Sequence, residues 1–132
     1  MRIIALAGSD SCGKTTTLNI VYARILNNGG NSTNRQQLGA DPNDFSDIVN
    51  LGARRVAFFT MGDYSRATVN AIRSYHALRV DILVCACNTK FTYPLNEVRK
   101  HTNNIVNKSV ANATLSELGA NTNDANTIFA LI

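Results

Sequence analysis

The stretch "ALAGSDSCGKTTTLNIVYARIL", residues Ala5–Leu26, decides the fold because it carries three structural signals in a row. The short apolar run Arg2–Ala7, which overlaps its start, is typical of a buried parallel strand. A small polar loop follows, bounded by Gly8 and Gly13. Apolar residues then recur at helical spacing over residues 14–28. The stretch therefore predicts a strand, a tight loop and a helix.

Strand and helix patterns continue to alternate along the rest of the chain. Residues Asp44–Asp63 contain two strand-like runs around a glycine-containing turn, which predicts a β-hairpin. The other expected elements are a loop with room for a short strand at Asn31–Asn43, a helix at Ser65–Leu78, a strand at Asp81–Cys87, a helix from Pro94 to about His101, a strand at Asn103–Val110 and a helix from Asn123. This order predicts a three-layer α/β sandwich with a mostly parallel sheet.

The composition predicts one globular domain spanning residues 1–132, with 45% hydrophobic and 17% charged residues. The net charge of +4 comes from scattered basic residues, so a nucleic-acid partner is not favoured. No apolar run approaches the roughly 18 residues of a membrane span, and no signal-peptide pattern is present. The three cysteines do not suggest a disulfide framework, and a cytoplasmic location is expected.

The loop matches the pattern G-x-x-x-x-G-K-[ST], known as Walker A. Its two glycines allow the backbone to curl and to approach a ligand closely, so that successive N–H groups form an anion-binding nest. A lysine then meets the β and γ phosphates, and the next hydroxyl ligates Mg²⁺. The expected nucleotide-binding residues are Gly8, Ser9, Asp10, Ser11, Cys12, Gly13, Lys14, Thr15 and Thr16.

In this context, between an apolar strand and an amphipathic helix, the motif resembles that of the P-loop nucleoside triphosphate hydrolase superfamily. The sequence match covers about the first thirty residues; the remainder agrees only in its layout. The resemblance implies a Rossmann-like sandwich that binds ATP or GTP with Mg²⁺. It also implies a catalytic role for Lys14 and a metal-binding role for Thr15.

The superfamily pairs this loop with an acidic residue at the end of a second strand, which holds Mg²⁺ directly or through water. Asp63 follows the apolar run Val56–Phe59, which is expected to lie beside the loop-bearing strand, so we assign the catalytic and metal-binding role to Asp63. The alternative is that Asp63 caps the next helix. Asp44 and Asp47 are lesser candidates, and Asp81 lies at the wrong end of its strand.

Subfamily motifs are mostly absent. The signature of ABC transporter ATPases is missing, and Ser9 stands where partition-type ATPases carry an additional lysine. Residues 107–110, "NKSV", lack the aspartate with which small GTPases read guanine. A small kinase requires an acceptor site and usually a basic lid, for which the candidates are Arg66, Lys90 and Arg99.

The sequence thus predicts an NTP-binding protein that hydrolyses its ligand slowly or transfers the γ-phosphate. Slow turnover is expected because neither a general base nor an arginine finger is evident. The alternative is a nucleotide-binding switch that acts through a protein partner; a third possibility is a loop that binds only phosphate or polyphosphate. We also expect a homodimer or partner complex. Cys85 and Cys87 are interpreted as small buried hydrophobes, whereas Cys12, beside the loop and the start of a helix, is a candidate redox-sensitive thiol.

Overall fold

The computed structural model describes residues 1–132, which form one seven-stranded sheet and four helices. The strands are β1 (Arg2–Gly8), β2 (Asn31–Ser32), β3 (Gln36–Gln37), β4 (Phe45–Leu51), β5 (Arg54–Phe59), β6 (Ile82–Asn88) and β7 (Thr102–Asn107). The helices are α1 (Lys14–Asn27), α2 (Ser65–Ala77), α3 (Tyr93–Val98) and α4 (Glu117–Leu131). None of the helices is long and apolar enough to cross a membrane.

The sheet is mixed, whereas the sequence predicted a mostly parallel one. Its strand order is β2-β4-β5-β6-β1-β7, and β3 pairs with β4 away from this path. The strands β5, β6, β1 and β7 run parallel, while β2, β3 and β5 all pair with β4 in antiparallel register. The β4–β5 hairpin was predicted correctly. The strands β2 and β3, two residues each, lie within the stretch 31–43, for which the sequence predicted a loop with room for one short strand.

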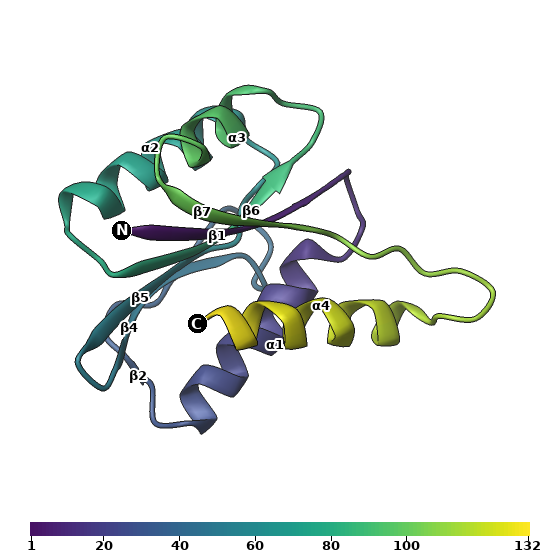
Figure 1. Ribbon diagram of the computed structural model, residues 1–132, viewed down its shortest axis with the longest axis horizontal. Coiled ribbons are helices and arrows are strands. Elements are labelled where there is room, and N and C mark those ends of the chain that lie inside the picture. The colour runs from purple at the N-terminus through teal and green to yellow at the C-terminus, as the bar shows by residue number, and fades with distance from the viewer.

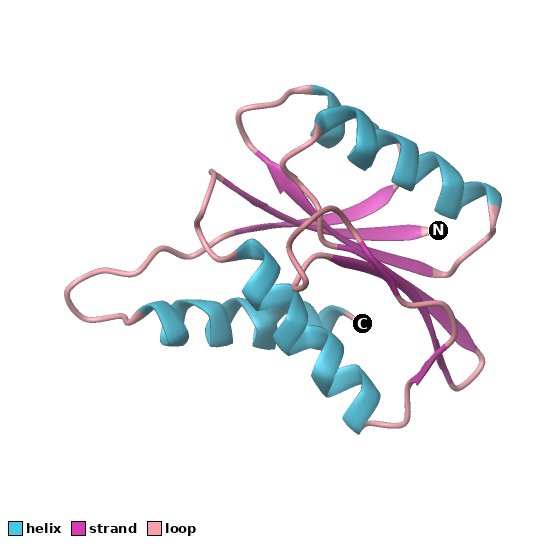
Figure 2. Cartoon of the chain, turned by 180° about the vertical axis from the view of Figure 1, so that it is seen from behind, coloured by secondary structure: helices cyan, strands magenta, loops and turns pink.

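Helices cover both faces of the sheet, as the sequence predicted for an α/β fold. Figures 1 and 2 show α2 and α3 on one face and α1 and α4 on the other. Side chains of β1 alternate between the two layers of core. Ile4 and Leu6 join the cluster beneath α1 and α4, while Ile3 and Ala5 join the cluster beneath α2 and α3. This burial on both sides explains why the strand sequence is continuously apolar.

The expectation that Val56–Phe59 lies beside the loop-bearing strand is wrong. Strand β5 contains this run, and β6 lies between β5 and β1. Both neighbours of β1, namely β6 and β7, come later in the chain. The strands that end beside the Gly8–Thr15 loop are therefore β6, whose last residue is Asn88, and β7, whose last residue is Asn107.

The last helix begins at Glu117, six residues before the expected start at Asn123. Its N-cap is Ser116, whose hydroxyl accepts a hydrogen bond from the N–H of Gly119 at 3.0 Å. A serine at this position is a favoured cap, followed here by a glutamate in the first turn. Helix α3 ends at Val98, earlier than the expected end near His101.

An ion-pair cluster around Glu97 joins α3 to α2, and it predicts that the stability of the fold depends on pH in the acid range. The Glu97 carboxylate lies 2.9 Å from Arg73 Nε and 2.9 Å from Lys100 Nζ. The hydrogen bond from Arg73, followed by that from Lys100, lowers the pKa of Glu97 from 4.5 to about 2.

Because the folded pKa of Glu97 is below the unfolded one, its stabilising contribution is present above about pH 4.5 and is lost as the pH falls towards 2. We expect Glu97→Gln to flatten this part of the stability profile, measured by urea unfolding of both proteins between pH 2.5 and 6. Parallel profiles for parent and variant would contradict the assignment. Lys100→Gln, which leaves the Arg73 partner in place, should have a smaller effect.

Candidate functional site

A cleft of about 330 Å³ opens at the carboxyl ends of the parallel strands. This is the edge at which ligands bind in open α/β sheets. The cleft is lined by Ser11, Cys12, Gly13, Lys14, Thr15, Thr16, Asp41, Asp44, Thr60, Gly62, Asp63 and Glu117. Six of the nine residues predicted to bind nucleotide thus lie on its wall, while Gly8, Ser9 and Asp10 form the adjoining arm of the loop.

The Gly8–Thr15 loop curls through two left-handed residues, Ser11 with φ 54° and Gly13 with φ 93°. Only glycine fits at position 13, since a Cβ there would lie 2.5 Å from Asn121 Oδ1. None of the N–H groups of residues 9–13 donates to a backbone carbonyl of the chain. The N-terminus of α1 also has no side-chain cap. Several consecutive N–H groups are therefore available to an anion at this turn.

Lys14 is folded back onto the loop. Its Nζ donates to the carbonyl oxygens of Gly8 at 3.1 Å and Ser9 at 2.5 Å, and lies 3.7 Å from Cys12 Sγ. Only 6% of the residue is exposed. The ammonium group is thus fixed close to the free N–H groups of the loop, where it adds a full positive charge to theirs.

A carboxylate meets the loop at Thr15. The Thr15 hydroxyl donates to Asp44 Oδ1 at 3.0 Å, and the Thr60 hydroxyl donates to the same oxygen at 2.9 Å. Thr60 is held in turn by the N–H of Phe45, which donates to its hydroxyl at 2.9 Å. Asp44, one of the two lesser candidates, is thereby the acidic residue in direct contact with the predicted metal ligand Thr15.

Asp63 lines the same cleft on the side of β6. Its Oδ1 accepts a hydrogen bond from Asn88 Nδ2 at 3.2 Å, and this amide nitrogen also donates to Asp10. The preceding Gly62 permits the approach of this turn to β6, since a Cβ there would lie 2.7 Å from the backbone oxygen of Ala86. Asn88 therefore connects the loop with the chain segment that carries Asp63.

Asp10 lies at the outer side of the loop. Hydrogen bonds from Lys90, whose Nζ lies 3.2 Å away, and from Asn88 lower the pKa of its carboxyl group. Lys90, one of the three proposed lid residues, thus pairs with the loop itself. Neither Arg66 nor Arg99 contributes to the wall of the cleft.

Asp47 is excluded as a metal ligand because the chain already satisfies its carboxylate. It is 1% exposed and accepts hydrogen bonds from the Tyr22 hydroxyl at 2.7 Å, the Ser32 hydroxyl at 2.5 Å and the N–H of Asn34 at 2.9 Å. Asp81 lies at the amino ends of the parallel strands, away from the cleft, and its carboxylate accepts a hydrogen bond from the N–H of Arg55 at 2.8 Å.

The donor set of the cleft fits a magnesium ion. Mg²⁺ prefers hard oxygen ligands and is usually bound by one or two carboxylates together with phosphate oxygens and water. The cleft supplies the Thr15 hydroxyl and the carboxylates of Asp41, Asp44, Asp63 and Glu117. No three Cys, His, Asp or Glu side chains gather into a group that would hold a metal by itself. A cation bound here would therefore rely on oxygens from a ligand as well.

The loop is braced from behind by residues that sequence reasoning missed. Lys108 packs on Gly8 so closely that a Cβ on the glycine would lie 2.9 Å from the Lys108 Cβ. The buried Nζ of Lys108 lies 3.0 Å from Asp124 Oδ2 on α4. Asp124 also accepts from the N–H and the hydroxyl of Ser109, both at 2.7 Å. Residues 107–109, which in the sequence resemble a guanine-reading motif, thus anchor the loop to α4.

The cysteines occupy different surroundings. Cys85 and Cys87 are fully buried, and their mutual hydrogen bond and burial raise the pKa of Cys85. The interpretation of these two as buried apolar side chains is therefore confirmed. Cys12 is partly exposed on the wall of the cleft.

None of the protein-family models, the curated proteins or the solved structures with which the chain was compared matches it.

Proposed function

We propose that this chain is a P-loop protein that binds a nucleoside triphosphate together with Mg²⁺ and hydrolyses it or transfers its γ-phosphate. One observation carries the proposal: the loop presents free N–H groups and Lys14 to a cleft that is otherwise lined by carboxylates and hydroxyls. The N–H groups and the ammonium suit phosphate oxygens, while the carboxylates suit a divalent cation.

The charges of the cleft favour the magnesium complex over the free nucleotide. Four carboxylates line the cleft, against the single ammonium of Lys14. A triphosphate without a cation would meet repulsion from these groups. In the proposed complex, Thr15, Asp44 and Asp63 are the residues that would hold Mg²⁺. When bound, the ion would neutralise charge on the transferred phosphoryl group.

Turnover by the isolated chain is expected to be slow. No arginine lines the cleft, so no group of this chain corresponds to an arginine finger. A neighbouring copy or another protein would have to supply such a charge, and the expected dimer or partner complex belongs to this proposal. The cytoplasmic location is also part of the proposal.

We expect that Asp124 does not recognise the base of the bound nucleotide. Both oxygens of this carboxylate accept hydrogen bonds from Ser109, and Oδ2 also pairs with Lys108. The carboxylate is therefore engaged within the chain, which weakens the case for guanine and makes ATP the first ligand to test.

Thermal unfolding tests the proposal, since a ligand that binds only the folded chain raises the melting temperature. At a concentration about 100 times its Kd, ATP with Mg²⁺ should stabilise the chain by roughly 2.7 kcal/mol, a shift of several degrees. We expect a much smaller shift with ATP and EDTA, and none with adenosine. Equal shifts for tripolyphosphate and ATP would indicate a site that reads only phosphate, and no shift with any triphosphate would contradict the proposal.

A further inference from the structure

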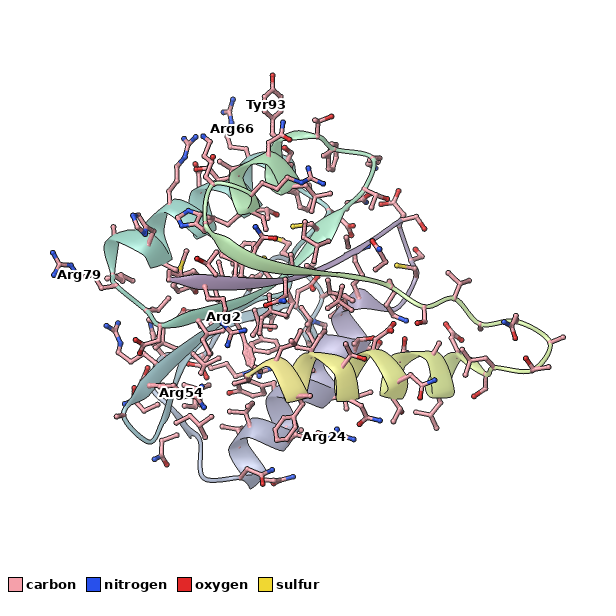
Figure 3. The ribbon with its side chains drawn as sticks, viewed as in Figure 1. Arg2, Arg24, Arg54, Arg66, Arg79 and Tyr93 are labelled. Carbon is pink, nitrogen blue, oxygen red and sulfur yellow. The ribbon has the colours of Figure 1, made fainter.

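A second cavity lies between α2 and α3, outside the cleft described above. It is a groove of about 420 Å³ lined by Ser65, Arg66, Val69, Asn70, Arg73 and Tyr93. Figure 3 shows Arg66 and Tyr93 projecting at the same side of the molecule, whereas Arg79 lies far away at the other end of α2. No residue lines both the groove and the cleft.

The groove carries positive charge and no carboxylate of its own. Arg66 makes no ion pair or side-chain hydrogen bond within the chain. Arg73 donates a hydrogen bond from Nε to Glu97. Its side chain is 62% exposed, and its two terminal nitrogens remain available to donate to a ligand. Glu97 is shared with Lys100, so its charge is already matched. Two guanidinium groups with free planar faces and donors suit a phosphate group.

The groove also carries an exposed aromatic ring. Tyr93 is 76% exposed, the highest value among the large hydrophobic residues on the surface. An aromatic ring beside guanidinium groups can bind a flat ring system by stacking. The lining thus combines recognition of an anion with recognition of a planar group.

The groove adjoins the phosphate end of the cleft. Only Tyr64 separates Asp63, on the wall of the cleft, from Ser65, on the wall of the groove. Two steps along the chain span at most about 7 Å. A ligand in the groove would therefore lie close to the carboxylate on the β6 side of the proposed triphosphate site.

We infer that the groove binds the phosphoryl acceptor, a small phosphorylated molecule with a flat ring, for which nucleoside monophosphates are the probes. This inference rests on the proposed function. In the step, an oxygen of the acceptor phosphate forms a new bond to the γ-phosphorus. The bond from that phosphorus to the β–γ bridging oxygen breaks, and its electron pair leaves with the nucleoside diphosphate. No proton is transferred when the acceptor phosphate is a dianion.

Binding is tested first, without triphosphate, by calorimetry with AMP, GMP, CMP and UMP. We expect at least one of these to bind, and Arg66→Gln to weaken that binding at least tenfold. Arg79→Gln is the matched control: it removes the same charge from an exposed site near the end of α2 and should change the affinity less than twofold. In Tyr93→Ala, the monophosphate should bind no more tightly than ribose 5-phosphate, which lacks the flat base. In Tyr93→Phe, the monophosphate should still bind more tightly than ribose 5-phosphate.

Transfer is tested next, by following ADP and nucleoside diphosphate formation from ATP, Mg²⁺ and the bound monophosphate. We expect one diphosphate of the acceptor for each ADP, with a rate that falls in Arg66→Gln and not in Arg79→Gln. Absence of monophosphate binding, or equal binding by parent and Arg66→Gln, would overturn the inference. The thermal shift with Mg²⁺ and ATP separates the two proposals: if it persists while the groove binds nothing, only the acceptor assignment fails.

Discussion

Lys14→Ala is expected to weaken triphosphate binding at least tenfold, about 1.4 kcal/mol, while the chain remains folded. The substitution removes the only basic side chain on the wall of the cleft. It also removes two hydrogen bonds from Nζ to the loop carbonyls, each worth about 1 kcal/mol of stability. The change in Kd is measured by calorimetry with Mg²⁺ and ATP, and folding by circular dichroism.

Two controls separate charge from packing in this experiment. Lys14→Met keeps most of the aliphatic stem, and we expect it to bind as poorly as the alanine variant. Lys100→Ala removes a lysine that pairs with Glu97, outside the cleft, and should leave the affinity unchanged. Retention of full affinity in Lys14→Ala would remove the phosphate-binding role from the loop.

Asp44→Asn is expected to abolish most of the Mg²⁺ dependence of binding and any hydrolysis, because Asp44 is the carboxylate in contact with Thr15. Asparagine retains the size and can still accept hydrogen bonds from Thr15 and Thr60, so the fold should survive. The measurement is a titration of nucleotide affinity and phosphate release against Mg²⁺ concentration.

Matched variants in the same cleft make this result specific. Asp41→Asn removes a charge from the same wall, at a carboxylate bonded only to the N–H of Asn43, and should have little effect. Asp63→Asn tests the assignment made from the sequence, and we expect a loss of turnover smaller than that in Asp44→Asn. Unchanged Mg²⁺-dependent hydrolysis in Asp44→Asn would refute the metal-binding role of Asp44. A larger loss of turnover in Asp63→Asn than in Asp44→Asn would favour Asp63 as the metal ligand.

The sequence predicted the loop, its flanking strand and helix, and the hairpin because these features are local. Each depends on a run of residues whose periodicity or turn residues can be recognised without knowledge of the rest of the chain. The residues from Ser11 to Thr16, which the sequence assigns to nucleotide binding, all line the cleft. The start of α4 was also within reach, because Ser116 and Glu117 carry a helix-start signal that the asparagine-rich tail obscured.

The neighbours of β1 were not predictable from local pattern. Strand β6 pairs with both β5 and β1, and this pairing joins strands that are far apart in the sequence. The pattern of any one segment does not show which distant strand it will pair with. The pairing of β6 with β1 brings Asn88 rather than an acidic residue to the strand end beside the loop. The burial of Asp47 was equally hidden, since it depends on partners contributed by α1 and β2. A polar residue ending a fully buried strand was the one signal that pointed to Asn88.

The most direct test of the triphosphate site is residue-resolved: backbone amide chemical shifts of the parent chain during titration with ATP and Mg²⁺. We expect the N–H signals of residues 9–16 to shift most, because these groups have no hydrogen-bond partner within the chain and would gain phosphate oxygens. Signals of Asp44 and Thr60 should shift with them, and EDTA should reverse the changes. Unshifted signals for residues 9–16 at millimolar ATP and Mg²⁺, with or without shifts elsewhere, would contradict the account.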